Sequence, residues 1–309
     1  MSLPFISVVV PTRDRLQHLQ HCLGALADLD YPRDRFEVIV VDDGGTATLP
    51  EPPPRARDMD LTIVRQAHRG PGAARNAGVE RARGSLVAFT DDDCVPARDW
   101  LRAYAAAAAA HPARIIGGAI QNGVGWNIYS EASQLLVTLL YRHHNSDPED
   151  IRFFTSNNLL VPTYIFRAEG GFEPREIRDT VEDRELIGRL RRRGHGLAFA
   201  EDAVVYHRHD LSLASFLEKN FHYGRGAVYF HRLRQRHEGG ATRPLPWSFF
   251  VELVRAPARM HYPSRAVALT ALLLLSQAAY AAGYLHERIA TDRGGGLRRY
   301  GDEKHQGVE

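Results

Sequence analysis

The first hundred residues alternate between two patterns of hydrophobic positions. Continuous apolar runs rich in β-branched residues are typical of buried strands, and they occupy residues 5–11, 36–43, 61–66 and 84–93. Between them, residues 14–29 repeat apolar positions at a spacing near 3.6, and residues 70–83 read as a helix that glycines open. This alternation of strand and helix predicts a parallel sheet flanked by helices.

The same patterns continue, less regularly, over the rest of the chain. Further helices are expected at 99–112, 129–145 and 181–194, and further short strands at 113–122, 153–162 and 197–210. Beyond about residue 240, an amphipathic segment at 244–260 precedes residues 266–285, which carry no charge. We therefore expect an α/β fold with a mixed, mainly parallel central sheet, flanking helices and a C-terminal hydrophobic helical segment.

Composition narrows the class of partner. The 309 residues carry a formal net charge of +2, and the basic residues are spread along the chain, so no nucleic-acid footprint is indicated. Cys22 and Cys94 lack the C-x-x-C spacing of a zinc site, which fits a reducing compartment. The N-terminal apolar run follows no basic leader and reads as a strand rather than a signal peptide. A small-molecule partner is the expectation that remains.

Three consecutive aspartates, Asp91, Asp92 and Asp93, end the apolar run at 84–93. Their carboxylates repel one another, and on a strand Asp91 and Asp93 project to the same side. A divalent cation, Mg²⁺ or Mn²⁺, would relieve this repulsion and suits a substrate diphosphate. The alternative is that the acids cap the helix at 99–110.

A second acid-tipped run ends at Asp42 and Asp43, and two glycines follow it. Because the carboxyl ends of parallel strands meet at one edge of the sheet, these acids are expected near the aspartate run. An acid there can accept hydrogen bonds from a nucleotide base or ribose. The alternative is a turn in which both side chains accept backbone N–H groups.

The glycine-opened helix permits two interpretations. Gly70-x-Gly72 follows a strand and opens a helix, as in a dinucleotide fingerprint, which would indicate an oxidoreductase. Against this, Arg75 stands where the third glycine belongs. In the other interpretation, Arg75 and Asn76 lie in the first turn of the helix and face a phosphate or hold the aspartate loop.

Taken together, these motifs resemble a known family. "VVVPTRDR", "VIVVDDGG", "GPGAARNAG", "LVAFTDDDCVP", "SNNLLVP" with a later "GGF", and "VEDRELIGRLRRRG" stand in the order and spacing of the family 2 glycosyltransferases, over residues 5 to about 230. The resemblance implies a Rossmann-like glycosyltransferase A-type fold, in which a catalytic domain at 1–240 has a nucleotide-sugar half (1–110) and an acceptor half (111–240). A helical region at 241–290 and a flexible polar tail at 291–309 would follow.

The resemblance also implies roles for individual residues. The metal would lie on Asp91 and Asp93, and Asp183 would be the catalytic base, with Glu182 beside it. The donor-binding residues would be Pro11, Thr12, Arg13, Asp42, Asp43, Arg75, Asn76, Asp91, Asp92 and Asn158.

The chemistry of the residues agrees with this assignment. Attack of an acceptor hydroxyl on the anomeric carbon of a nucleotide-sugar needs a base and a cation on the departing diphosphate. If Asp183 approaches from the face opposite the diphosphate, the configuration inverts. A nucleotidyltransferase of sugar phosphates would use similar acids, and a non-catalytic membrane-associated carbohydrate-binding protein is the alternative outside enzymes. Acids at a helix N-terminus, favoured by the dipole, are the structural alternative for Glu182 and Asp183.

Two further segments carry weaker signals. His207 and His209 lie on the same side of a strand with metal-ligand spacing, and His207 is a minor candidate ligand, although strand histidines are more often only solvated. Residues 220–234 mix aromatics with arginines after glycines and form either a lid over the diphosphate or an amphipathic helix.

The hydrophobic segment completes the sequence expectations. Residues 266–285 have the length of a membrane span, but a helix packed on the protein or one lying on the membrane surface also fits. Arg255, Arg259 and Arg265 precede it, as is typical where a helix meets anionic lipid. We expect a cytoplasmic enzyme at the inner face of the membrane, touching it through 245–285. Its partners would be a nucleotide-diphosphate sugar and a carbohydrate or lipid-linked acceptor of a cell envelope polysaccharide.

Overall fold

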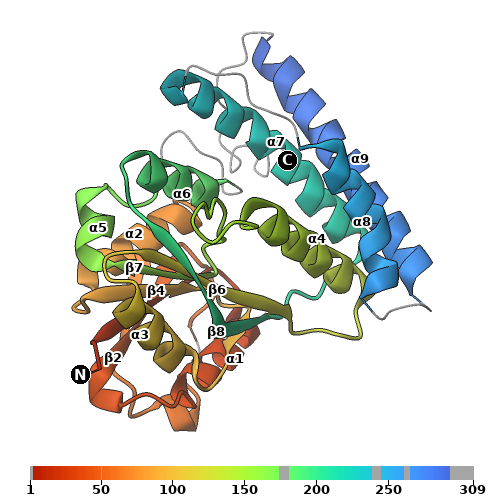
Figure 1. The fold of residues 1–309 in the computed structure, drawn as a ribbon. Helices are drawn as coiled ribbons and strands as arrows, with labels where there is room; N and C mark the ends of the chain where they lie inside the picture. Colours follow the sequence, from red (N-terminus) through yellow and green to blue (C-terminus); the bar gives the residue numbers. More distant parts are fainter. Residues whose placement is uncertain (1–2, 50, 174–180, 239–244, 261–264, 293–309) are drawn as a thin grey trace. The chain divides into compact units, whose positions relative to one another are not determined.

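The computed structural model describes residues 3–49, 51–173, 181–238, 245–260 and 265–292. The chain divides into two compact units (Figure 1). The first consists of residues 1–174 and 183–210, and the second of residues 175–182 and 211–309.

The first unit is built on an eight-stranded sheet in the order β3-β2-β1-β4-β7-β6-β8-β5. Strands β1 to β4 pair in parallel, β6 pairs in parallel with β8, and β7 and β5 run antiparallel to their neighbours. Their bounds are β1 (Ile6–Thr12), β2 (Phe36–Asp43), β3 (Leu61–Gln66), β4 (Leu86–Thr90), β5 (Cys94–Pro96), β6 (Ile115–Asn122), β7 (Asn158–Pro162) and β8 (Leu197–His207). The predicted mixed, mainly parallel sheet is confirmed.

Helices cover both faces of this sheet. Because side chains alternate along a strand, Val8 and Val10 of β1 enter one core while Val9 enters the other. The first core packs against α1 and α3, and the second against α2, α5 and α6. The helices are α1 (Leu16–Ala27), α2 (Pro71–Arg81), α3 (Trp100–Ala110), α4 (Ile128–His144), α5 (Thr163–Ala168) and α6 (Glu182–Arg192), with short 3₁₀ turns at Arg33–Arg35 and Pro54–Ala56.

The second unit contains α7 (Leu213–Glu238), α8 (Trp247–Arg259) and α9 (Ala266–Asp292). Gly224 and Gly283 let the backbones of α7 and α9 touch, because a Cβ on Gly224 would lie 1.9 Å from the carbonyl oxygen of Tyr280. Residues 211–238 group with the C-terminal helices in this unit. The predicted polar tail lies outside the described residues beyond 292.

The arginine that was a candidate for a mobile lid is held in this helix pair. Nε of Arg225 on α7 lies 2.6 Å from Oε2 of Glu287 on α9, and both side chains are buried. Tyr229 donates to the same carboxylate. Of the two interpretations for residues 220–234, the structure shows the helix. α9 is long and apolar enough to cross a membrane by length and composition alone, and 28% of its apolar window is buried.

Candidate active site

The first unit gathers polar side chains where the parallel strands end. Parallel pairing of β1 with β2 places Thr12 beside Asp42, and the hydroxyl of Thr12 donates to Oδ2 of Asp92 at 2.8 Å. Pro11 is buried next to Thr12, the last residue of β1, and Arg13 is exposed immediately after the strand. Thr12 thus contacts both Asp42 and the aspartate run, which confirms that the acids of the two segments lie at one edge of the sheet.

The aspartate run is a turn and not the end of a strand. β4 ends at Thr90, so Asp91 to Asp93 form the connection to β5. The expectation that Asp91 and Asp93 project to one side of a strand is therefore wrong. The capping alternative fails too, because α3 begins at Trp100 behind Asp99, and no side chain caps it.

Each aspartate of the turn has a basic partner. Oδ1 of Asp91 lies 2.6 Å from Nη2 of Arg75. Asp92 and Asp93 share the guanidinium of Arg15, whose Nη1 is 2.9 Å from Oδ1 of Asp92 and whose Nη2 is 2.7 Å from Oδ2 of Asp93. Arg15 was not predicted from the sequence. Its only signal there is its place three residues beyond the end of a strand.

The pKa values of the two buried carboxyls of the turn are shifted in opposite directions. Burial raises the pKa of Asp92 to about 7, against the opposing charge of Arg15. Burial would also raise the pKa of Asp93, but His207 and Arg15 hold it well below its usual range. Asp93 therefore stays ionised to lower pH than Asp92, which makes it the better ligand for a cation.

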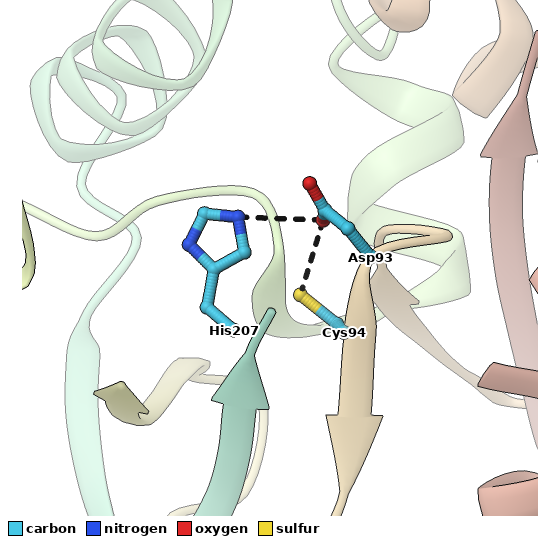
Figure 2. A group of neighbouring side chains, drawn as sticks. All are labelled: Asp93, Cys94 and His207. Atoms are coloured by element: carbon cyan, nitrogen blue, oxygen red, sulfur yellow. Dashed lines mark hydrogen bonds and ion pairs between the residues drawn. The ribbon is translucent and has the colours of Figure 1, made fainter. Parts of the chain in front are cut away.

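His207 reaches this aspartate through strand pairing. Antiparallel β5 and β8 set Cys94 opposite His207, and the backbone N–H of Arg208 donates to the carbonyl oxygen of Asp93 at 2.7 Å. Nε2 of His207 then lies 3.3 Å from Oδ1 of Asp93. Figure 2 shows the His207 ring and the Cys94 thiol both facing the Asp93 carboxylate.

These side chains fit a divalent metal ion. The ligand atoms of Asp93, Cys94 and His207 all lie within 4.8 Å of one another. Burial raises the pKa of the Cys94 thiol well above its usual value, so it is protonated and a poor ligand. The carboxylate and imidazole that remain suit Mn²⁺ better than Mg²⁺, which strongly prefers oxygen. Asp91 is outside this cluster among the described residues.

The two acids at the end of β2 differ in how many hydrogen bonds their carboxylates make within the protein. Oδ1 of Asp42 accepts the backbone N–H of Gly45 at 2.9 Å in a tight turn, and its other oxygen lies 3.8 Å from Arg65. The carboxylate of Asp43 is bonded at 2.7–2.9 Å to Gln66, His68 and the backbone amides of Arg69 and Gly70. Asp42 thus matches the turn alternative, whereas Asp43 holds the loop before α2, and we no longer place Asp43 against the donor.

This loop also decides against a dinucleotide site. In a dinucleotide fingerprint, the backbone amides at the glycine turn bind the pyrophosphate. Here the amides of Arg69 and Gly70 are already bonded to Asp43.

Arg75 and Asn76, adjacent on α2, have different surroundings. Arg75 is 3% exposed and lies over the ring of Phe172 while it pairs with Asp91. Asn76 donates to the carbonyl oxygen of Phe172 at 2.7 Å and accepts its N–H at 2.9 Å. Asn76 therefore holds the turn at Gly171, whose φ is +66°, rather than facing a phosphate. Arg75 does hold the aspartate loop, as the second interpretation states.

The buried side chain of Asn158, on β7, connects several elements of the first unit by hydrogen bonds. Its side chain is 0% exposed, and its Oδ1 accepts from Trp100 at 2.9 Å and from Tyr104 at 2.6 Å. Its Nδ2 donates to the carbonyl oxygens of Ala119 and Ala203, both at 2.8 Å. The amide has no capacity left for a ligand, so we withdraw Asn158 from the donor-binding residues.

The proposed base lies at the start of α6. Asp183 is partly buried, and its Oδ1 accepts the N–H of Arg184 at 2.7 Å. Burial raises its pKa, although Arg184, Arg75 and the backbone amide of Ser156 oppose the shift. Arg75 thus acts on both Asp183 and Asp91. Glu182, the first residue of α6, is itself buried.

Comparisons with known proteins identify the family of the chain. A model of glycosyl transferase family 2 matches residues 7–168. The chain is 26% identical over 235 residues to glycosyltransferase AglE of Haloferax volcanii, with 74% of each chain covered. It is 27% identical over 228 residues to the pre-mycofactocin glycosyltransferase of Mycobacterium tuberculosis, and this match covers 72% of the chain but only 47% of that relative.

Solved structures share the fold. The mannosyltransferase PcManGT of Pyrobaculum calidifontis, in complex with GDP-Man and Mn²⁺, aligns with a TM-score of 0.62 at 20% identity, covering 96% of this chain and 88% of that one. Residues 1–349 of TarS from S. aureus align with a TM-score of 0.54 at 19% identity, covering 95% and 93%.

Proposed function

The chain belongs to glycosyl transferase family 2 and is a glycosyltransferase, and from this premise we propose that it transfers a sugar from a nucleoside diphosphate to a hydroxyl acceptor with inversion. The observation that supports this most is the contact of His207 with Asp93 in the acidic turn, 3.3 Å apart. Arg75 connects that turn electrostatically with Asp183. A cation site and a candidate base thus belong to one charged network.

The donor is proposed to bind along the edge formed by β1, β2 and the acidic turn. Thr12 and Asp42 lie side by side there, and Oδ2 of Asp42 has only Arg65, 3.8 Å away, as a partner among the described residues. A nucleoside offers hydroxyl and N–H groups that such oxygens accept. Pro11, Arg13, Asp91 and Asp92 complete the proposed donor contacts. PcManGT, which shares the fold, was solved with GDP-Man.

We assign the metal to Asp93 and His207, with Asp91 as a further candidate, and favour Mn²⁺ because an imidazole is present. When bound, the ion would offset negative charge on the departing diphosphate. Arg75, already buried against Asp91, would hold that carboxylate in position. Asp92, whose pKa is raised to about 7, would face the donor as a hydrogen-bonding group.

Asp183 is proposed to remove the acceptor proton. As the acceptor oxygen forms its bond to the anomeric carbon, the bond from that carbon to the diphosphate oxygen breaks, and the proton passes to the Asp183 carboxylate. The diphosphate leaves with the electron pair of the broken bond. A raised pKa suits this role, because a base that is too weak accepts a proton poorly.

The decisive experiment is incubation with a panel of nucleotide-sugars, Mn²⁺ and hydroxyl acceptors. Release of nucleoside diphosphate, dependent on acceptor, supports the proposal. Formation of pyrophosphate from a nucleoside triphosphate and a sugar phosphate would instead favour the nucleotidyltransferase.

The second unit is proposed to contact the membrane surface. α9 exposes an apolar stripe, and the large exposed side chains of α8 and α9 are Trp247, Val254, Val267, Leu274, Leu275, Leu285 and Ile289. Arg255 and Arg259 are exposed on α8 and would meet anionic headgroups. Because Glu287 of α9 is buried against Arg225 of α7, insertion of α9 as a lone span would break that pair. We therefore favour contact of the second unit with the cytoplasmic surface of the membrane over a membrane span. The acceptor is proposed to be a carbohydrate or a lipid-linked molecule.

A further inference from the structure

Arg15 occupies the carboxylates that a metal ion needs. Its guanidinium bridges Oδ1 of Asp92 at 2.9 Å and Oδ2 of Asp93 at 2.7 Å. The remaining oxygens of both acids are also engaged, because Oδ2 of Asp92 accepts from Thr12 and Oδ1 of Asp93 faces His207. A cation bound between Oδ1 of Asp93 and His207 would therefore lie on the same carboxylate as the Arg15 guanidinium, which would oppose it by charge repulsion.

The backbone fixes where Arg15 starts. The preceding Asp14 adopts a left-handed conformation, with φ of +53°, which costs energy for any residue but glycine. Its Oδ1 accepts the N–H groups of Thr46 at 2.7 Å and Ala47 at 2.9 Å. These bonds tie the end of β1 to the turn after β2, so Arg15 leaves the backbone from a fixed point.

Solvent, and so a ligand, can reach the side chain of Arg15. Arg15 is 43% exposed, whereas Asp92 and Asp93 beneath it are buried. A guanidinium binds two oxygens at once, and a diphosphate offers the same paired acceptors as the two carboxylates. Since Arg15 is cationic, it repels a metal ion bound beside it unless new negative charge arrives.

We propose that Arg15 is a positioning residue that couples metal binding to diphosphate binding. Without ligands it neutralises Asp92 and Asp93, and it competes with the metal ion for Asp93. When the donor binds, its diphosphate takes over the guanidinium and frees the carboxylate, so metal and donor bind together. This inference rests on the proposed metal and donor sites of the first unit.

The test measures affinities and not turnover. Mn²⁺ is titrated into the ligand-free protein by calorimetry, and UDP or GDP is titrated with saturating Mn²⁺ and with EDTA. In wild type we expect Mn²⁺ to bind weakly when no nucleotide is present. We expect saturating Mn²⁺ to tighten the binding of UDP or GDP at least about tenfold, and this factor is the coupling, because each ligand changes the affinity of the other equally. In Arg15→Gln we expect Mn²⁺ alone to bind about tenfold tighter and the coupling to fall by at least about tenfold.

Two further variants keep the outcome decisive. Arg102→Gln removes the same charge and an exposed pair with Asp30, and should leave both quantities at their wild-type values. Arg15→Lys keeps the charge but cannot bind two oxygens as a guanidinium does, so its Mn²⁺ affinity and coupling should lie between those of wild type and Arg15→Gln. This lysine variant also provides the test if the glutamine variant fails to fold. If folded Arg15→Gln, or Arg15→Lys, binds Mn²⁺ no more tightly than wild type, the inference about Arg15 is overturned while the proposed metal site stands. Absence of Mn²⁺ binding to wild type, even with diphosphate, overturns the proposed metal site as well.

Discussion

Nε2 of His207 lies 3.3 Å from Oδ1 of Asp93, a contact that arises because β5 pairs antiparallel with β8. If both are metal ligands, His207→Ala removes one ligand and leaves the sheet intact. We expect Mn²⁺ affinity to fall at least about tenfold, and the preference for Mn²⁺ over Mg²⁺ to shrink, because oxygen ligands remain. Calorimetric titration of each ion measures both effects.

The matched control is His111→Ala. His111 is exposed at the end of α3 and has no place in the metal cluster. The His111→Ala variant should bind Mn²⁺ with the affinity of wild type. Equal Mn²⁺ affinity in His207→Ala and wild type would show that His207 is a polar neighbour of Asp93 and not a metal ligand.

Asn158 should matter for stability and not for recognition. Asn158→Ala leaves the buried donors of Trp100 and Tyr104 and two buried carbonyls without their partner. We expect the free energy of unfolding to fall by about 2–5 kcal/mol, measured by urea denaturation. Donor affinity of the folded variant should remain near wild type. Loss of donor affinity at unchanged stability would return Asn158 to the donor site.

The sequence predicted the sheet better than it predicted the site. β2 and β3 have the bounds expected at 36–43 and 61–66, because continuous apolar runs between polar loops define a buried strand locally. The aspartate run was misplaced because β4 ends at Thr90. That ending depends on β5 turning to pair with β8, a contact distant in sequence.

The roles of individual side chains at the site were not predictable from the sequence for a related reason. Asn158 and Asn76 looked like ligand-binding amides, but their partners Trp100 and Phe172 come from other elements. Arg15 meets Asp93 from a loop that Asp14 ties to the turn after β2, another contact between segments distant in sequence. The motif order identified the family, whereas the division between binding and structural residues required the packed structure.

The apolar stripe of α9 gives a membrane prediction. Leu274 and Leu285 are 52% and 56% exposed, so replacing both with glutamine removes apolar area without disturbing a core. We expect weaker flotation with phosphatidylglycerol vesicles. The control Ile63→Gln, an exposed apolar residue on β3 of the first unit, should float as wild type does. Equal flotation of all three proteins would refute the surface contact.

The raised pKa of Asp183 sets the expected pH dependence. Burial keeps this carboxyl protonated to a higher pH than usual, and the protonated form cannot accept the acceptor proton. The rate should therefore fall as pH falls through the raised pKa, above the ordinary aspartate value of about 4. A profile of kcat against pH, at saturating donor and Mn²⁺, locates this limb. A limb at the ordinary aspartate value would contradict the assignment.

Asp183→Asn separates catalysis from binding. If the carboxylate takes the proton only while the new bond forms, its contribution belongs to the transition state, and donor affinity should stay nearly unchanged. The rate should fall by about 10²- to 10⁴-fold, and the low-pH limb assigned to this carboxyl should disappear. Glu182→Gln, one residue earlier on α6, is the comparison and should retain most of the rate. If Asp183→Asn turns over normally with a verified donor and acceptor while Glu182→Gln is slow, the base is Glu182.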